Sequence, residues 1–210
     1  SAFTGIIEKK GTTTLVRHEG RNGGHMTEVE LKVVLTGPMA AALPARLAEL
    51  GFTMGECHQE TDLYFNGGGR DFRKTDEALR LRRALSAGGD GTTFVTYKGP
   101  KRDPRSNTRL EYETVVGNFD TARDILCALG FQPVFTVEKV RQTFLRGPVT
   151  ACLDQVNGLG DFLELEHLLP DGAARDPAVD ELLALLDGLG IARQALERRS
   201  YLELLLSAQG

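Results

Sequence analysis

Charged residues occupy alternate positions in several short segments of this chain, and the residues between them are mostly apolar. Side chains two positions apart in an extended strand point to the same face and lie about 6.6 Å from one another. The charged sets are Glu28, Glu30 and Lys32; Arg80 and Arg82; Arg109, Glu111 and Glu113; Lys139 and Arg141; and Glu164 and Glu166. Each segment is therefore predicted to be a strand with one apolar face and one charged face.

Two arrangements could accommodate these charged faces. Half-exposed antiparallel sheets alternate in this manner, with their charged side chains in water. A closed barrel with helices packed on its apolar exterior would instead collect the charges in one tunnel. Together with Lys98 and Asp154, the alternating positions supply seven acids and seven bases. This mixture of unlike charges favours the tunnel.

Turn residues and hydrophobic periodicity divide the chain into short strands and a few helices. Asp120 is expected to cap one helix, and Asp176 followed by Pro177 is expected to cap another. The expected strands cover 27–36, 57–66, 78–85, 92–98, 109–116, 134–146, 149–155 and 161–168, and the expected helices cover 38–50, 121–129, 178–189 and 194–207. Strands joined in hairpins, with helices between them, predict an antiparallel α+β protein.

The size and charge of the chain limit its class and its partners. A length of 210 residues, with 41% hydrophobic and 26% charged residues, fits a globular protein of one domain or two small lobes. The formal net charge of -4 argues against binding to nucleic acid polymers or acidic lipid, although local basic clusters could hold a compact anion. No apolar run approaches the roughly 20 residues of a membrane helix, so no membrane association is expected.

The three cysteines, Cys57, Cys127 and Cys152, are far apart and odd in number. Such spacing argues against a zinc site or a disulfide framework. Free thiols suit a reducing compartment, so a cytoplasmic location is expected.

The first 25 residues differ in composition from the rest of the chain. They are rich in Gly, Thr, Lys and Arg, and they end at His25, directly before Met26. We interpret residues 1–25 as an expression leader or a disordered segment, with a native leader as the alternative. Residues 26–210 are predicted to form a single tunnel domain.

The residue types on the charged faces suit a metal-bound polyphosphate. Arginine presents planar donors that bind phosphate in a bidentate manner. Magnesium prefers oxygen ligands, which carboxylates supply. Because Glu28, Glu30 and Lys32 share one strand face, a cation site would lie beside a phosphate site.

An ordered set of motifs resembles the CYTH family of triphosphate tunnel metalloenzymes. The set comprises Glu28-x-Glu30-x-Lys32, Ala78-Leu79-Arg80-Leu81-Arg82, Thr96-Tyr97-Lys98-Gly99-Pro100, Lys139-x-Arg141, Asp154 and Glu164-Leu165-Glu166. Gln59-x-x-Asp62-x-Tyr64-Phe65 and the late segment from Arg199 to Leu205 look most like the class IV adenylyl cyclase, or CyaB-like, branch of the family. The resemblance covers residues 27 to about 206.

The resemblance implies a closed, eight-stranded antiparallel β-barrel with helices outside, a Mg²⁺ or Mn²⁺ cofactor, and roles for individual residues. Metal binding is implied for Glu28, Glu30, Asp154, Glu164 and Glu166, and triphosphate binding for Lys32, Arg80, Arg82, Lys98, Arg109, Lys139 and Arg141. Glu28, Glu30 and Lys32 are also expected to act in catalysis. For Glu111 and Glu113, pairing with the tunnel arginines is favoured over metal ligation.

The same resemblance leaves the reaction open. The leading hypothesis is an adenylyl cyclase that converts ATP into cyclic AMP and pyrophosphate. The rival enzyme hydrolyses tripolyphosphate, thiamine triphosphate or a nucleoside triphosphate in the same tunnel, and a third alternative is a noncatalytic polyphosphate-binding module. The branch resemblance also implies a homodimer. Among the other residues, Tyr97 is expected in the core, and His58 and His167 are expected at the surface.

Overall fold

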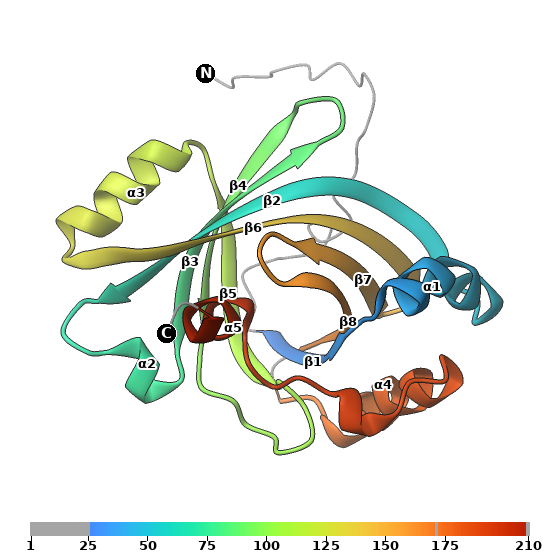
Figure 1. Ribbon diagram of the computed structural model, residues 1–210. Helices are drawn as coiled ribbons and strands as arrows, with labels where there is room; N and C mark the ends of the chain where they lie inside the picture. The colour runs from blue at the N-terminus through green and yellow to red at the C-terminus, as the bar shows by residue number, and fades with distance from the viewer. Residues whose placement is uncertain (1–25, 171, 209–210) are drawn as a thin grey trace, which may run out of the picture.

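The computed structural model describes residues 26–170 and 172–208. Eight strands close into one barrel, in the order β1-β5-β4-β3-β2-β6-β7-β8 (Figure 1), and every neighbouring pair is antiparallel. The predicted fold class is therefore confirmed. The strands are β1 (Met26–Val34), β2 (Thr53–Gly67), β3 (Ala78–Ser86), β4 (Gly91–Lys98), β5 (Arg109–Val116), β6 (Phe131–Arg146), β7 (Val149–Val156) and β8 (Gly160–Pro170).

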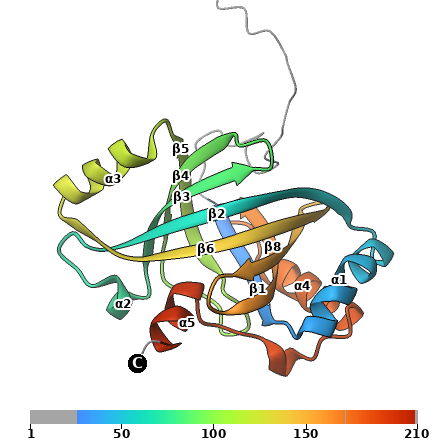
Figure 2. The same cartoon turned by 45° about the horizontal axis from the view of Figure 1, so that its top comes forward.

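The helices lie outside the barrel, as expected. They are α1 (Gly37–Glu49), α2 (Phe72–Thr75), α3 (Phe119–Ala128), α4 (Asp176–Gly188) and α5 (Tyr201–Ala208), with a 3-10 turn, η1, at Arg193–Ala195. In both views α1 and α4 lie together on one side of the barrel, and α3 lies on the opposite side (Figures 1 and 2). Within the described residues, no helix combines the length and the apolar composition that spanning a bilayer requires.

The largest hydrophobic core lies between the barrel wall and the α1–α4 pair. The apolar residues between the charges of β1 and β8 point outward into it, and Leu31 and Leu165 are almost fully buried there against leucines of α1 and α4. Each fully buried leucine stabilises the fold by about 1.5–3 kcal/mol relative to an exposed one. Because side chains alternate along a strand, this outward packing directs the charged residues of the same strands inward.

Helix starts differ from the predictions in two places. Asn118 caps α3, because its side chain accepts a hydrogen bond from the Thr121 N–H at 2.8 Å, so the expected Asp120 cap is wrong. Asp176 is the first helical residue of α4 rather than its cap, and Arg175 precedes it.

The expected helix over 194–207 is confirmed only for its second half, α5, because the chain leaves the helical path after η1. Leu196 forms a β-bridge with Val33, and the Glu197 N–H donates to the Lys32 carbonyl at 2.8 Å. These bonds to β1 replace helical ones. The helix resumes where Ser200 and Glu203 each accept a hydrogen bond from the other's backbone N–H, which is a capping box. The predictions for residues 1–25 lie outside the described residues.

Candidate functional site

The charged strand faces line one pocket inside the barrel. The pocket holds about 680 Å³ of space that includes its open mouth. Its lining contains every predicted site residue except Asp154: Glu28, Glu30, Lys32, Arg80, Arg82, Lys98, Arg109, Lys139, Arg141, Glu164 and Glu166. The tunnel arrangement is therefore present, and the alternative of charges facing bulk water is wrong.

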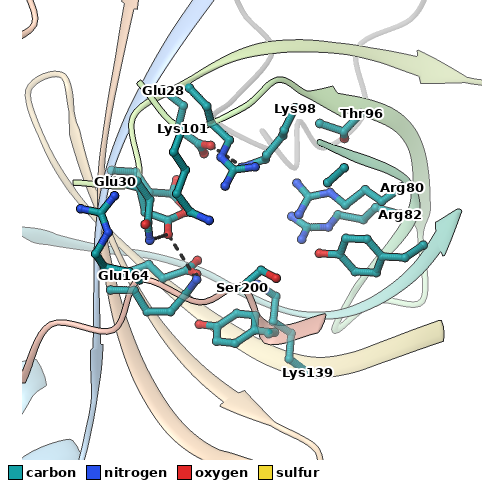
Figure 3. Close-up of a pocket in the computed structure, with 18 of the residues that line it drawn as sticks. Glu28, Glu30, Arg80, Arg82, Thr96, Lys98, Lys101, Lys139, Glu164 and Ser200 are labelled. Atoms are coloured by element: carbon teal, nitrogen blue, oxygen red, sulfur yellow. Dashed lines mark hydrogen bonds and ion pairs between the residues drawn. The ribbon is translucent and has the colours of Figure 1, made fainter. Parts of the chain in front are cut away.

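Acidic side chains gather on one side of the pocket, where several of them form ion pairs with bases such as Lys98 and Arg141. Figure 3 shows Glu28, Glu30 and Glu164 on one side of the cavity and Arg80 and Arg82 on the other. The acids come from β1 and β8, whereas the facing bases come mainly from β3, β4, β5 and β6. A ligand in the pocket would meet carboxylates with their paired bases on one side and the guanidinium groups of Arg80 and Arg82 on the other.

Three carboxylates of the acidic wall converge. Oxygens of Glu28, Glu30 and Glu166 lie within 4.8 Å of one another, and all three residues are buried. The β1–β8 register places Glu30 directly opposite Glu166, which explains why the two strands bring these acids together. Oxygen donors of this kind suit a hard divalent cation such as Mg²⁺ or Mn²⁺. The donor chemistry and the spacing therefore fit the cofactor that the sequence predicts.

Glu164 and Asp154 contact basic side chains. Glu164 lies 3.2 Å from the Lys32 ammonium and also contacts Arg141. Asp154 accepts from Lys139 at 2.9 Å and from the Arg141 Nε at 2.6 Å. Neither acid belongs to the group of three converging carboxylates, so metal binding by Glu164 and Asp154 stays a prediction.

Lys32 lies between two acids and keeps its charge. Burial opposes protonation, but Glu30 at 3.3 Å and Glu164 at 3.2 Å outweigh burial and raise the pKa of Lys32. For Glu164 the effects have the opposite signs. Burial alone would raise the pKa of Glu164, but the charges of Lys32 and Arg141 lower it well below its ordinary value. The pocket therefore contains formed charges of both signs at neutral pH.

Two acids of β2, Glu60 and Asp62, belong to the same charged interior but were not predicted there. Arg82 contacts Asp62 at 2.6 Å and Glu60 at 3.0 Å, and Lys139 contacts Glu60 at 3.2 Å. Burial alone would raise the pKa values of both acids, but the neighbouring bases lower them, with Arg82 the largest of these. Glu60 and Asp62 alternate, but Gln59 and Thr61 beside them are polar, so the pattern gave no clear charged face.

Both histidines expected at the surface are largely buried. His58 shares the face of Glu60, and its Nε2 lies 2.9 Å from the Glu60 carboxylate. The side chain of His167 is 12% exposed and lies between β8 and α4, where it contacts Glu181 at 3.5 Å. Tyr97 is partly buried and packs against the hydrophobic cluster beside α3, on the apolar side that was expected, and its hydroxyl donates to Glu77.

Segments outside the strands complete the pocket lining. Tyr201 of α5 donates its hydroxyl to Asp154 at 2.8 Å, and its ring lies 4.6 Å from the Lys32 ammonium and 4.9 Å from that of Lys139. Burial, followed by the nearby Asp154, raises the pKa of the Tyr201 phenol well above its ordinary value. The phenol is therefore a neutral donor. The further lining residues include Lys101, Asn107, Arg198 and Ser200, for which no site role was predicted.

Residues 26–201 match the model of the CYTH domain. The chain belongs to the CYTH domain family. This CYTH domain is similar to two proteins that are named as adenylate cyclases. A Methanocaldococcus jannaschii protein, provisionally named an adenylate cyclase, is 41% identical over 85% of this chain and 98% of the relative. The adenylate cyclase CyaB of Aeromonas hydrophila is 31% identical over 83% of this chain and 86% of the relative.

Solved structures share the barrel. A Pyrococcus horikoshii protein superposes with a TM-score of 0.77 at 39% identity, over 86% of this chain and 99% of that protein. A Hippeastrum protein, provisionally named an adenylyl cyclase and described as having a dominant triphosphatase activity, has a TM-score of 0.61 at 16% identity. The superposition covers 87% of this chain and 96% of the Hippeastrum chain, and at this identity it shows a shared fold alone. The predicted homodimer and cytoplasmic location stay predictions.

Proposed function

We propose that this CYTH domain protein is a divalent-metal-dependent adenylyl cyclase that converts ATP into cyclic AMP and pyrophosphate. The names of the two similar adenylate cyclases support the reaction, and one observation carries the metal and triphosphate part of the proposal. The carboxylate group of Glu28, Glu30 and Glu166 lies in the same pocket as a wall of buried arginines and lysines. A pure anion site would gain nothing from such acids, whereas a site for a cation-bound triphosphate needs both kinds of group.

Glu28, Glu30 and Glu166 would hold the Mg²⁺ or Mn²⁺ ion, since their oxygens already converge. When bound, the ion neutralises phosphate charge and lowers the pKa of the ribose 3′-hydroxyl. Glu164 and Asp154 have a different role in this proposal. Because both acids lie outside the converging group and contact Arg141, as Glu166 also does, they hold its guanidinium in place.

The basic side chains would bind and orient the triphosphate. Arg80 and Arg82 present planar donors to phosphate oxygens, and Lys98, Arg109, Lys139 and Arg141 add positive charge along the pocket. Lys32, which is held between Glu30 and Glu164, would donate to a phosphate oxygen as negative charge develops. These contacts bring the 3′-oxygen to the α-phosphorus. As that bond forms, the 3′-hydroxyl releases its proton to solvent, the bond from the α-phosphorus to the bridging oxygen breaks, and pyrophosphate leaves with the electron pair.

A second function, triphosphate hydrolysis, is favoured by the composition of the pocket. Among the described residues that line the pocket, the apolar or aromatic ones are Tyr64, Ala78 and Tyr201, so the site offers few side chains that would recognise a nucleobase. An enzyme that binds only the triphosphate part of its substrate needs no side chains that recognise a nucleobase. Water would then attack the terminal phosphorus and release a proton to solvent. The bond from that phosphorus to the bridging oxygen would break, and the shortened phosphate chain would leave with the electron pair while the same basic side chains hold it.

Product analysis distinguishes the two reactions. The protein is incubated with ATP or tripolyphosphate and Mg²⁺ or Mn²⁺, and the products are separated by chromatography. Cyclic AMP and pyrophosphate from ATP support the cyclase, whereas ADP or orthophosphate supports the hydrolase. Binding without turnover of either compound contradicts both enzymes and leaves a polyphosphate-binding module.

A further inference from the structure

Asn107 lies at the end of the loop between β4 and β5, directly beside the acidic wall. Its backbone N–H donates to the Glu30 carbonyl at 2.9 Å, and its side-chain Nδ2 donates to the Glu30 Oε1 at 3.1 Å. The backbone bond continues the antiparallel register in which Arg109 faces Glu28. One buried residue therefore contacts both the main chain and the carboxylate of a proposed cation ligand.

The loop holds Asn107 firmly in this position. The hydroxyls of its neighbours Ser106 and Thr108 lie 2.5 Å apart, and both residues are buried. The Arg102 N–H donates to the Thr108 carbonyl at 2.7 Å, which closes the loop on itself. Because its neighbours are fixed, Asn107 reaches Glu30 without having to order a mobile segment.

The contacts at Glu30 converge on one of its two oxygens. Asn107 Nδ2 lies 3.1 Å from Oε1, and the Lys32 ammonium lies 3.3 Å from the same atom. The two donors at Oε1 fix the orientation of the carboxylate. Within the described part of the chain, Oε2 therefore stays available to a cation. The amide must present its NH₂ group here, because a carboxylate oxygen can only accept hydrogen bonds.

The oxygen of the Asn107 amide indicates that a ligand binds beside it. Its Oδ1 is buried and has no hydrogen-bond partner within residues 26–170 and 172–208, and the residue lines the pocket. Buried acceptors nearly always have a partner. A cation keeps water molecules in its coordination shell, and such waters are hydrogen-bond donors.

We propose that Asn107 is a positioning residue for the divalent cation. Its Nδ2 orients the Glu30 carboxylate, and its Oδ1 accepts a hydrogen bond from a cation-bound water. The inference rests on the proposed function, because it requires the cation at Glu28, Glu30 and Glu166. It goes beyond that function by assigning cation affinity to a neutral residue outside the barrel strands.

The test measures Mn²⁺ binding without substrate, by calorimetry, in the full chain and its variants. Asn107→Ala should weaken Mn²⁺ binding by roughly tenfold, which is the lower bound for loss of a group that supports a metal ligand. Asn107→Ser, whose side chain is too short to reach Oε1, should weaken it likewise and serves if the alanine variant does not fold. Asn157→Ala is the matched control, because the exposed Asn157 amide donates to Glu138 away from the pocket.

Kinetics supply a second readout that a merely structural role would not give. Asn107→Ala should raise the Mn²⁺ concentration for half-maximal activity by a similar factor, with the KM for the triphosphate at saturating Mn²⁺ within twofold of wild type. Mn²⁺ affinity within twofold of wild type in a folded Asn107 variant overturns the inference alone. A wild-type protein that binds no Mn²⁺ overturns the proposed function and this inference with it.

Discussion

Arg82 and Asp62 face each other on adjacent strands and form a two-pronged ion pair inside the barrel. Arg82 Nε donates to Asp62 Oδ1 at 2.6 Å, and Nη2 donates to Oδ2 at 2.7 Å. Both side chains are at least 95% buried. The pair fixes the plane of the guanidinium before any phosphate arrives, which lowers the ordering cost of binding.

Asp62→Asn should destabilise the protein, because it leaves the buried Arg82 with a neutral partner in place of one of its acids. The expected loss is about 3 kcal/mol, the low end for breaking one side of a buried ion pair, since Glu60 still contacts Arg82. Urea unfolding followed by circular dichroism measures this change. A loss below about 0.5 kcal/mol would show that the pair does not support the fold.

Arg82→Ala should weaken binding of tripolyphosphate. A charged hydrogen-bonding group of this kind contributes roughly 1.5–3 kcal/mol, which corresponds to a dissociation constant about 10 to 150 times higher. Arg83→Ala is the matched control on the same strand, because Arg83 points outward and lies over the Phe119 ring at 4.5 Å. Calorimetry on both variants tests the assignment. Equal effects at the two positions would contradict it.

The charged interior should make stability depend on acid pH. The folded-state pKa values of Glu60, Asp62 and Glu164 lie below their ordinary values of 4.5, 3.8 and 4.5, because nearby bases outweigh burial. The unfolded chain therefore binds protons at a higher pH than the folded chain does. Stability contributed by these groups is present above about pH 5 and is lost as the pH falls through the lowered values.

Urea unfolding at a series of pH values from 7 to 3 measures this dependence. The free energy of unfolding should fall steadily below about pH 5, and the fall should be shallower in Asp62→Asn. Stability that stays constant, or rises, over this range would contradict the charged state assigned to the interior.

The sequence was sufficient for the barrel where apolar residues separate the charges. Between Glu28 and Lys32 the intervening residues are Val29 and Leu31, so the pattern alone gives an apolar exterior and a charged interior. In β2 the residues between His58, Glu60 and Asp62 include Gln59 and Thr61, which are polar. That stretch has no clear apolar face, so its inward-pointing acids and its buried histidine could not be assigned from periodicity.

Site residues outside the strands could not be predicted either. Asn107 and Tyr201 belong to a loop and to a C-terminal helix, and their places depend on contacts distant in sequence. The helical pattern after residue 193 suggested one continuous helix. The Glu197 N–H instead bonds to Lys32 of β1, and this tertiary contact overrides local propensity and sets Tyr201 into the pocket.

Tyr201→Phe should cost little stability, whereas Tyr201→Ala should cost much more. The phenylalanine variant loses the hydrogen bond to Asp154, about 1 kcal/mol, but keeps the ring beside Lys32, Lys139 and Phe162. The alanine variant also loses the buried ring, at about 3–5 kcal/mol. Thermal and urea unfolding measure the stability of both variants. Equal destabilisation of the two would contradict the packing role of the Tyr201 ring.

A crystal of the protein grown with Mn²⁺ and tripolyphosphate tests the central claim most directly, because manganese can be located by its anomalous scattering. We expect a manganese peak among the carboxylates of Glu28, Glu30 and Glu166, with the phosphate chain beside it against Arg80 and Arg82. Glu30→Gln should abolish the peak while the barrel stays closed. Manganese and phosphate bound outside the barrel, with the pocket empty, would contradict the account.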